Sequence, residues 1–455
     1  MQMVPPNILF ILTDQQRFDT CGCYGQKLEV TPNLDHLAKE GVCFKHAFTN
    51  QPVCGPARSI LQTGIYPTET GCYRNGIALP QNIQTIARLL TNHGYQVAYI
   101  GKWHLASTIG RSKEKRLKKV KQMTTPIPYD FRGGYNDFWL ASDLLEFTSH
   151  AYEGHLFDKN GEKQEFKGYR VDCLTDFAIS YLKSIRLEKP FFLFLSYLEP
   201  HQQNDHNAFE GPKDSKLKFK EYEIPKDLKG KEGDWEEFFP DYLGCCNSID
   251  KNLKRLIGKL KELNIYENTN IIFTSDHGCH FRTRNQEYKR SCHDNSSRIP
   301  LVIKGKDFKE GEIIEELVSL IDLPPTIMKM AHIDIPKFMK GTPLQNLIQN
   351  EDSFKEWPQE ILIQISETQV GRALRTKKWK YSVKAPNKDG MLYSKSDLYE
   401  EEFLYDLEND PHERNNLISN VEYSEIKNNL SKLLLQKMVE AGENAAEITP
   451  KIPVK

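Results

Sequence analysis

The sequence predicts an α/β fold: one large mixed, mostly parallel sheet flanked by helices on both faces, followed by a small antiparallel sheet with a helix. Three observations support this prediction. Four apolar, strand-like runs recur at residues 7–13, 97–101, 191–198 and 270–275. Helical patterns separate these runs, and such alternation is typical of a doubly wound, parallel sheet. After about residue 350, the sequence changes to short strand-like pieces separated by turns.

The four apolar runs suit central strands, because a strand covered on both faces buries all of its side chains. In sheets of this kind, ligands bind at the carboxyl ends of the strands. Each run is followed by residues fit for chemistry, namely Asp14-Gln15, Lys102-Trp103-His104, Glu199-Pro200-His201 and Asp276-His277. The sequence therefore predicts that these side chains converge on an active site at one edge of the sheet.

Helices are expected at residues 31–41, 83–92 and 242–263, the last with a clear apolar stripe. Beyond residue 350 there are short strand-like pieces with turns between them, and a final helix at about residues 424–441. We therefore expect a main domain at 1–350 and a small α+β subdomain at 351–455.

The composition excludes several classes of protein. The chain has 455 residues and a formal net charge of −1, so no global field favours nucleic acid or an acidic membrane surface. No run reaches the roughly 18 apolar residues of a membrane helix, and the first residues lack the pattern of an export signal. The ten cysteines fit reduced, mostly buried thiols. We expect a soluble, cytoplasmic protein.

Two polar stretches interrupt the alternation of strands and helices. Residues 109–169 begin with a basic run at 113–121, and residues 202–241 are rich in charged residues and glycine. The basic run is interpreted as a solvated face. Long insertions after strand ends also carry substrate-binding loops.

The sharpest local signal is Cys54-Gly-Pro-Ala-Arg58, followed at a short distance by Thr63-Gly64. Pro56 suits the start of a helix and Gly64 its end. Cys54 is therefore expected at a helix N-terminus, where the backbone dipole favours an anion, and Arg58 lies one turn further along. On these residues alone, Cys54 is either a low-pKa thiol nucleophile or a structural cysteine.

With these motifs, the chain resembles the type I, formylglycine-dependent sulfatases of the alkaline phosphatase superfamily. Cys-x-Pro-x-Arg followed by Thr-Gly is similar to the signature in which a dedicated maturation enzyme oxidises the cysteine to formylglycine. Six matches in the right order make the resemblance specific. The matching segments are residues 11–14, 31–38, 101–104, 199–201, 275–278 and 404–411.

The resemblance implies an alkaline-phosphatase-like fold and hydrolysis of a sulfate monoester, such as a sulfated sugar or an aryl sulfate, to an alcohol and inorganic sulfate. A formylglycine hydrate bound to a divalent metal would attack sulfur. The implied metal ligands are Asp14, Gln15, the modified Cys54, Asp276 and His277. The implied catalytic residues are Cys54, the cations Arg58, Lys102 and Lys289, the acid His201, and His104, which would handle the proton of the hydrate.

Gln15 and His277 depart from the commonest pattern of the family, in which Asp and Asn occupy these positions. The site is then less negative, and Ca²⁺ is the first choice of metal, with Mn²⁺ or Mg²⁺ second. The Asp14-Gln15 pair and the cysteine motif also resemble phosphonate monoester and phosphodiester hydrolases of the same superfamily, which is the alternative function. An alternative of another class is a catalytically inactive anion-binding protein.

Substrate contacts are predicted from adjacency in sequence to the catalytic positions. Polar side chains there would suit the hydroxyls of a sulfated sugar, and loop residues without a substrate role are the alternative. The residues are Gln202, His206, His280, Arg282, Arg284 and His293.

Overall fold

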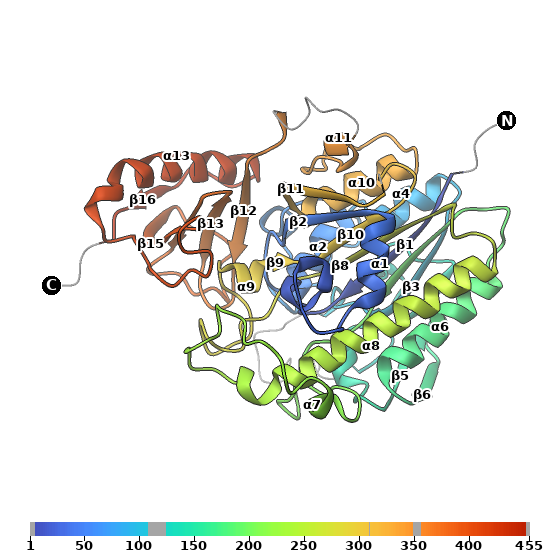
Figure 1. Cartoon of the computed structure of the whole chain (residues 1–455). Coiled ribbons are helices and arrows are strands. Elements are labelled where there is room, and N and C mark those ends of the chain that lie inside the picture. Colours follow the sequence, from blue (N-terminus) through green and yellow to red (C-terminus); the bar gives the residue numbers. More distant parts are fainter. Residues whose placement is uncertain (1–4, 108–123, 309, 349–355, 452–455) are drawn as a thin grey trace.

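The computed structural model describes residues 5–107, 124–308, 310–348 and 356–451, which form two sheets with helices around them (Figure 1). The basic run predicted at 113–121 and the predicted boundary between residues 350 and 351 lie outside these ranges. Within them, the larger sheet has 11 strands and the smaller sheet has 5. The predicted α/β class, with a separate C-terminal sheet, is confirmed.

The larger sheet is parallel at its centre. Its four central strands are the four runs predicted from the sequence, and every residue in them is buried. In spatial order they are β8 (Thr269–Ser275), β1 (Asn7–Thr13), β7 (Phe191–Ser196) and β3 (Gln96–Lys102), each parallel to its neighbour. Their carboxyl ends therefore point to the same edge of the sheet, as the site prediction requires.

The outer strands make the sheet mixed. Next to β3 lie β4 (Phe138–Ser142), β5 (Glu153–Asp158) and β6 (Lys163–Lys167), with antiparallel pairing from β4 outward. Next to β8 lie β10 (Leu301–Lys304), β2 (Val42–Phe48) and β11 (Glu312–Ser319), and β9 (Arg298–Ile299) pairs with β2. The first polar insertion thus contributes three strands to one side of the sheet.

Helices cover both faces of the larger sheet, and the side chains of β1 alternate between the two hydrophobic cores that result. Ile8, Phe10 and Leu12 belong to one core, and Leu9 and Ile11 belong to the other. The first core includes α2 (Cys54–Thr63), α4 (Ile86–Asn92) and α10 (Leu323–Met330). The second includes α1 (Pro32–Glu40), α6 (Arg170–Ser184) and α8 (Trp235–Glu262). Short helices are α3 (Pro67–Thr70), α7 (Ser215–Lys218), α9 (Asp294–Ser297) and α11 (Gln345–Ile348).

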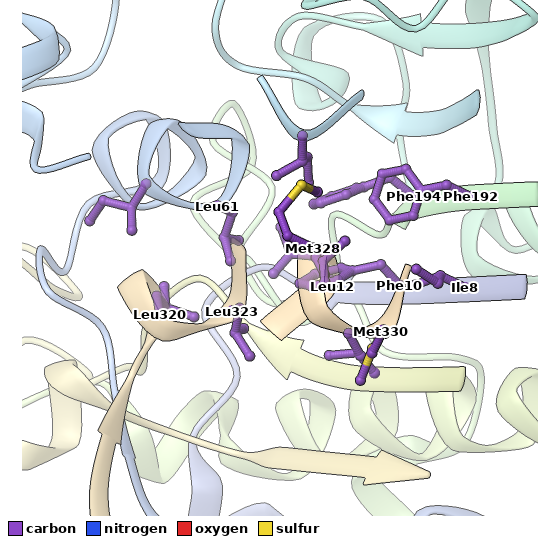
Figure 2. Close-up of a cluster of buried hydrophobic side chains, with 14 of the residues drawn as sticks. Ile8, Phe10, Leu12, Leu61, Phe192, Phe194, Leu320, Leu323, Met328 and Met330 are labelled. Carbon is purple, nitrogen blue, oxygen red and sulfur yellow. The ribbon is translucent and has the colours of Figure 1, made fainter. Parts of the chain in front are cut away.

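Figure 2 shows the first core, in which Phe10 of β1 lies beside Phe194 of β7 and side chains of α2 and α10 lie nearby. The rings of Phe10 and Phe194 are stacked, with centroids 4.6 Å apart. Each such fully buried side chain stabilises the fold by about 1.5–3 kcal/mol. This packing fixes the N-terminus of α2 relative to the ends of the central strands.

The predicted helices are present, with two differences at their starts. α4 begins at Ile86, three residues after the predicted start at residue 83. α8 begins at Trp235, two turns before the predicted start at residue 242. Pro240 lies inside these turns, and a proline in a helical pattern is normally taken as a break. Here Trp235 and Phe239 are buried in a local core with Phe281, which favours the helix despite the proline.

The smaller sheet consists of β12 (Glu360–Ile365), β13 (Gly371–Thr376), β14 (Trp379–Lys384), β15 (Leu398–Asp406) and β16 (Glu447–Thr449). The ladders are antiparallel except for the last, in which β16 runs parallel to β15. α13 (Ser424–Glu440) covers this sheet, in agreement with the predicted last helix (Figure 1).

Within the described residues, no helix is both long enough and apolar enough to cross a membrane. All ten cysteines lie in the described ranges and none forms a disulfide. Eight are buried and two are half-buried, which confirms the prediction of unpaired, mostly buried thiols.

Candidate active site

The structure brings the polar ends of the central strands together around Cys54, the first residue of α2. The Sγ atom of Cys54 lies 3.5 Å from Asp14 Oδ1, 3.2 Å from His277 Nε2 and 3.0 Å from Lys289 Nζ. Asp14 follows β1 and His277 follows β8, so three distant segments meet at one helix N-terminus. Gly64 ends α2 in the left-handed conformation, as its sequence position predicts.

Asp14 is the centre of a buried charge network. Its Oδ2 atom accepts from Arg58 Nη2 at 3.0 Å and lies 2.8 Å from Lys102 Nζ. Arg58 Nε is 3.3 Å from Asp276 Oδ2, and Lys102 Nζ is also 3.2 Å from Glu146 Oε1. Buried charges need such partners, because an isolated charge loses its hydration. Arg58 and Lys102 are therefore held in place by carboxylates of the site.

Lys289 differs from the other two cations. It is only 4% exposed, and its Nζ atom donates to Gln15 Oε1 and Cys54 Sγ, both at 3.0 Å. Among the described residues, no carboxylate oxygen lies within ion-pair distance of this ammonium group. A buried cation without a paired carboxylate is suited to bind an anion from outside the protein.

The pKa values show which groups are charged. Burial raises the pKa of the Cys54 thiol to about 12, and the negative charge of Asp14 adds to this effect. Burial would also raise the pKa of Asp14, but the positive charges around it, led by Lys102, hold it well below its ordinary value. Of the two interpretations left open by the sequence, a low-pKa thiolate is therefore not supported, because burial and the charge of Asp14 outweigh the charges of Lys289 and Lys102.

Four residues of the site could hold a metal ion. One donor atom each from Asp14, Cys54, Asp276 and His277 lies within 4.8 Å of the others. His277 Nδ1 hydrogen-bonds to the Gly278 carbonyl at 2.9 Å, which leaves Nε2 directed at the group. Such a contact to the second ring nitrogen is usual for a metal-binding histidine.

Two further observations fit a cation between the carboxylates. Burial and the charge of Asp14 raise the pKa of Asp276, so the two carboxylates destabilise each other's charged forms. Asp276 Oδ2 is buried and accepts no hydrogen bond from the described residues, and its ion-pair partner Arg58 Nε lies 3.3 Å away. Gln15, with φ of 71°, lies beside the group: its backbone N–H donates to Asp276 Oδ1 at 3.0 Å, and its side-chain Oε1 accepts from Lys289 Nζ. This donor set, mainly oxygen, suits a hard divalent cation.

His104 and His201 line a cavity of about 380 Å³ that opens from Cys54. His201 Nδ1 hydrogen-bonds to the Gln202 carbonyl at 2.6 Å, and His104 Nδ1 has no partner among the described residues. Burial lowers the pKa of both imidazoles, and the positive charges of Lys102 and Lys289 lower it further. Both rings are therefore neutral at pH 7 without a ligand, and an anion in the cavity would favour their protonation.

The sequence did not indicate several residues that line this cavity. Glu146 and Phe147 come from the first polar insertion. Glu367 comes from the loop between β12 and β13, and Met391 comes from the loop between β14 and β15. Arg290 also lines the cavity, where its guanidinium pairs with Glu287 and Glu367 at 2.5 and 2.6 Å. No motif marks these positions, because they come from segments that meet only in the folded chain. Segments associated with both sheets thus line the cavity.

The predicted substrate contacts fall into two groups. Gln202 lines the cavity and accepts from Gln15 Nε2 at 2.8 Å. The other five do not line it. His280 hydrogen-bonds to the Lys289 carbonyl, and His293 hydrogen-bonds to Tyr405 Oη. Arg282 donates to Asn207, Arg284 donates to the carbonyls of His412 and Glu413, and His206 lies at the surface. Their side chains are engaged elsewhere in the protein, and their role in substrate binding stays a prediction.

Comparison with known proteins identifies the family. The Sulfatase family matches residues 6–333, and the family described as N-sulphoglucosamine sulphohydrolase, C-terminal, matches residues 286–440. An N-acetylglucosamine-6-O-sulfatase of Bacteroides thetaiotaomicron is 25% identical, over 96% of this chain and 87% of that protein.

Two solved structures share the fold. One is BT4656 in complex with its substrate D-glucosamine-2-N,6-O-disulfate, with a TM-score of 0.77, 22% identity, and coverage of 97% of this chain and 99% of the other. The other is the phosphonate monoester hydrolase of Agrobacterium radiobacter, with a TM-score of 0.73, 19% identity, and coverage of 96% of both chains. At these identities the likeness concerns the fold alone.

The predicted alternatives, a phosphonate monoester or phosphodiester hydrolase and an inactive binding protein, are not favoured, because the family match spans the residues that form the site. The match includes Asp14, Cys54, Lys102, His201 and Asp276, whose side chains lie together at the carboxyl edge of the central sheet. The chain belongs to the sulfatase family and is a hydrolase of sulfuric esters.

Proposed function

We propose that this sulfatase hydrolyses the sulfate monoester of a sugar, or an aryl sulfate, after a maturation enzyme has converted Cys54 to formylglycine. The observation that carries the proposal is the position of Lys289: a buried ammonium group without a carboxylate partner in the described residues, 3.0 Å from Cys54 Sγ. It supplies a fixed positive charge where sulfate oxygens gain charge during transfer. The relative named N-acetylglucosamine-6-O-sulfatase and the polar cavity wall favour a sugar.

The proposed metal ligands are Asp14, Gln15, Asp276 and His277, together with the modified residue 54. Their mainly oxygen donors favour Ca²⁺, with Mn²⁺ or Mg²⁺ as the second choice. When bound, the ion would activate the oxygen nucleophile and offset the charge of the sulfate group. Asp14 and Asp276, two carboxylates close together, supply most of the negative charge that such an ion needs.

The other residues of the site orient the ester and move protons. Arg58 is fixed by Asp14, by the Lys102 carbonyl and by Ser196 Oγ, so its guanidinium is preorganised. His201 lines the cavity and is proposed to donate a proton to the leaving oxygen, once the bound anion has favoured its charged form. His104 is proposed to accept the proton when sulfate is released.

The proposal is tested with purified protein in which conversion of Cys54 is measured by intact mass, since formylglycine replaces the SH and one H by a carbonyl oxygen. Matched aryl sulfate, aryl phosphate diester and aryl phosphonate monoester substrates, and sulfated N-acetylglucosamine, are compared with the Cys54→Ala variant as control. A kcat/KM highest for a sulfate ester, and lost in Cys54→Ala, is the expected result. A preference for the phosphonate or the diester would contradict it.

The maturation enzyme and the cytoplasmic location are further parts of this proposal. Conversion of Cys54 upon co-expression with a formylglycine-generating enzyme, and its absence without one, is the expected observation. Fractionation of the native cells would test the location.

A further inference from the structure

Beside the active-site cavity, three side chains from two polar insertions lie together at the surface. His150 precedes β5, and Asp205 and His206 belong to the loop after β7. His150 Nε2 is 2.7 Å from Asp205 Oδ2, and His206 Nε2 is 3.9 Å from the same oxygen. The two imidazole rings are stacked, with centroids 4.8 Å apart and planes at 3°. One donor atom from each of the three residues lies within 4.8 Å of the others.

The atoms of this group that face away from its centre are already held. The carboxylate of Glu210 bonds to His206 Nδ1, which leaves Nε2 directed at Asp205. Gln203 Nε2 donates to Asp205 Oδ1 at 2.9 Å, which leaves Oδ2 for a ligand. Metal-binding histidines and carboxylates usually have these outer contacts, because the contacts fix the tautomer and the orientation of the ligand.

Gln203 connects this group to the rest of the protein. It is 1% exposed, and its Nε2 also donates to the Glu146 carbonyl at 2.8 Å, while Arg170 donates to its Oε1 at 3.3 Å. The position of Asp205 is therefore set by a buried residue. A simple surface ion pair with Asp205 would need only one histidine, whereas here two imidazoles from separate insertions face one carboxylate.

We propose that His150, Asp205 and His206 bind a divalent transition-metal ion, with Zn²⁺ as the best match. Two imidazole nitrogens and one carboxylate oxygen are ligands that zinc prefers, and they leave a fourth position for water or a substrate group. The ion replaces the hydrogen bond between His150 and Asp205. The three side chains are each about half exposed, at 47%, 52% and 48%, so they can rotate to the shorter distances of metal coordination.

This site joins two segments that form one wall of the active-site cavity. Glu146 and Phe147 lie just before His150 in the sequence, and Gln202 and Asn204 lie just before Asp205, and all four line the cavity. An ion bound between the two segments would hold this wall together. We therefore expect Zn²⁺ to lower KM for a sugar sulfate without a comparable change in kcat.

The test uses the full chain, matured and saturated with Ca²⁺, so that the active site does not take up the added ion. Zn²⁺ is titrated by calorimetry into the wild type, His150→Ala, His206→Ala and Glu210→Gln. The matched control is His36→Ala, because His36 on α1 also pairs with a glutamate four residues further on, Glu40, but is not part of the group. Cobalt absorption in the visible range serves as a second readout of imidazole binding.

One Zn²⁺ binding event is expected in the wild type and in His36→Ala, and its loss in His150→Ala and His206→Ala. Glu210→Gln is expected to weaken binding by about 10- to 100-fold, because it removes only the outer contact. Equal Zn²⁺ binding in all five proteins, or none in the wild type, would overturn the proposal. Unchanged melting temperatures without metal would show that the variants are folded.

Discussion

Two regions of the molecule bury clusters of charged side chains, and they use them differently. At the contact between the two sheets, Asp294 of α9 and Glu413 face Arg375 of β13 and Lys380 of β14. Arg375 Nη2 is 3.2 Å from Asp294 Oδ2, Lys380 Nζ is 2.5 Å from Glu413 Oε1, and Lys380 also contacts Asp294. Two carboxylates and two cations balance each other there.

The active site contains cations too, but Lys289 has no carboxylate partner in the described residues and faces a cavity. This difference shows how a buried charge with a structural role can be distinguished from one that binds a ligand. A balanced cluster contributes to the native structure, since removing one partner leaves the other uncompensated. A buried cation that faces a cavity and has no paired carboxylate is instead suited to bind a ligand. The following experiments test this distinction, from the largest expected effect to the smallest.

Cys54→Ala is expected to lower kcat by roughly 10⁴- to 10⁶-fold, because it removes the residue from which the nucleophile is formed. The side chain is small and buried, so the melting temperature should change little. The measurement is the initial rate with an aryl sulfate, with folding checked by circular dichroism. Residual activity above a hundredth of the wild type would disprove the role of Cys54.

Lys380→Met is expected to destabilise the protein by about 3–5 kcal/mol, because it leaves the buried Glu413 without its ion-pair partner and leaves Asp294 with Arg375 alone. Urea unfolding measures the effect. The kcat of the folded fraction should stay close to that of the wild type, since Lys380 lies outside the cavity lining. A large loss of kcat with unchanged stability would contradict the assignment of this cluster to structure.

Lys289→Met is the matched variant in the active site. It is expected to lower kcat/KM by about 10²- to 10³-fold, as does the loss of one group that stabilises the transition state. Its free energy of unfolding should stay the same or rise, because a buried charge without a paired carboxylate is removed. A loss of stability as large as that of Lys380→Met would break the comparison between the two clusters.

Removal of the divalent ion with a chelator is expected to abolish activity and lower the melting temperature. A ligand present at 100 times its Kd stabilises the folded state by about 2.7 kcal/mol. Re-addition of Ca²⁺, Mn²⁺ or Mg²⁺ in parallel identifies the ion. Full activity after complete removal, verified by elemental analysis, would rule out a metal at Asp14 and Asp276.

A pH titration of stability gives the smallest expected effect. Burial would raise the pKa of Asp294, but the charges of Arg375 and Lys380 outweigh it and depress the pKa. The unfolded chain therefore binds a proton first, so this contribution is present above about pH 4 and is lost as the pH falls further. Asp294→Asn should flatten the acid limb of the stability curve measured by urea unfolding. An unchanged limb would show that other carboxylates dominate it.

Many residues of the active site could be predicted from single segments of the sequence. The apolar runs before Asp14 and Asp276 predicted parallel central strands, and the ends of such strands share one edge. The position of Cys54 at a helix start followed from Pro56 and Gly64, two local signals. The length of α8 did not follow, because Pro240 signals a break that packing of Trp235 and Phe239 outweighs.

The sequence by itself determined the four central strands, the helix that begins at Cys54, and the set of polar residues at the strand ends, because hydrophobic periodicity and capping are local properties. Only the tertiary structure decided that the thiol of Cys54 stays protonated and that Lys289 has no carboxylate beside it in the described residues. It also decided that Glu367 and Met391 of the C-terminal region line the cavity. Burial and charge pairing depend on segments hundreds of residues apart, which no local pattern encodes.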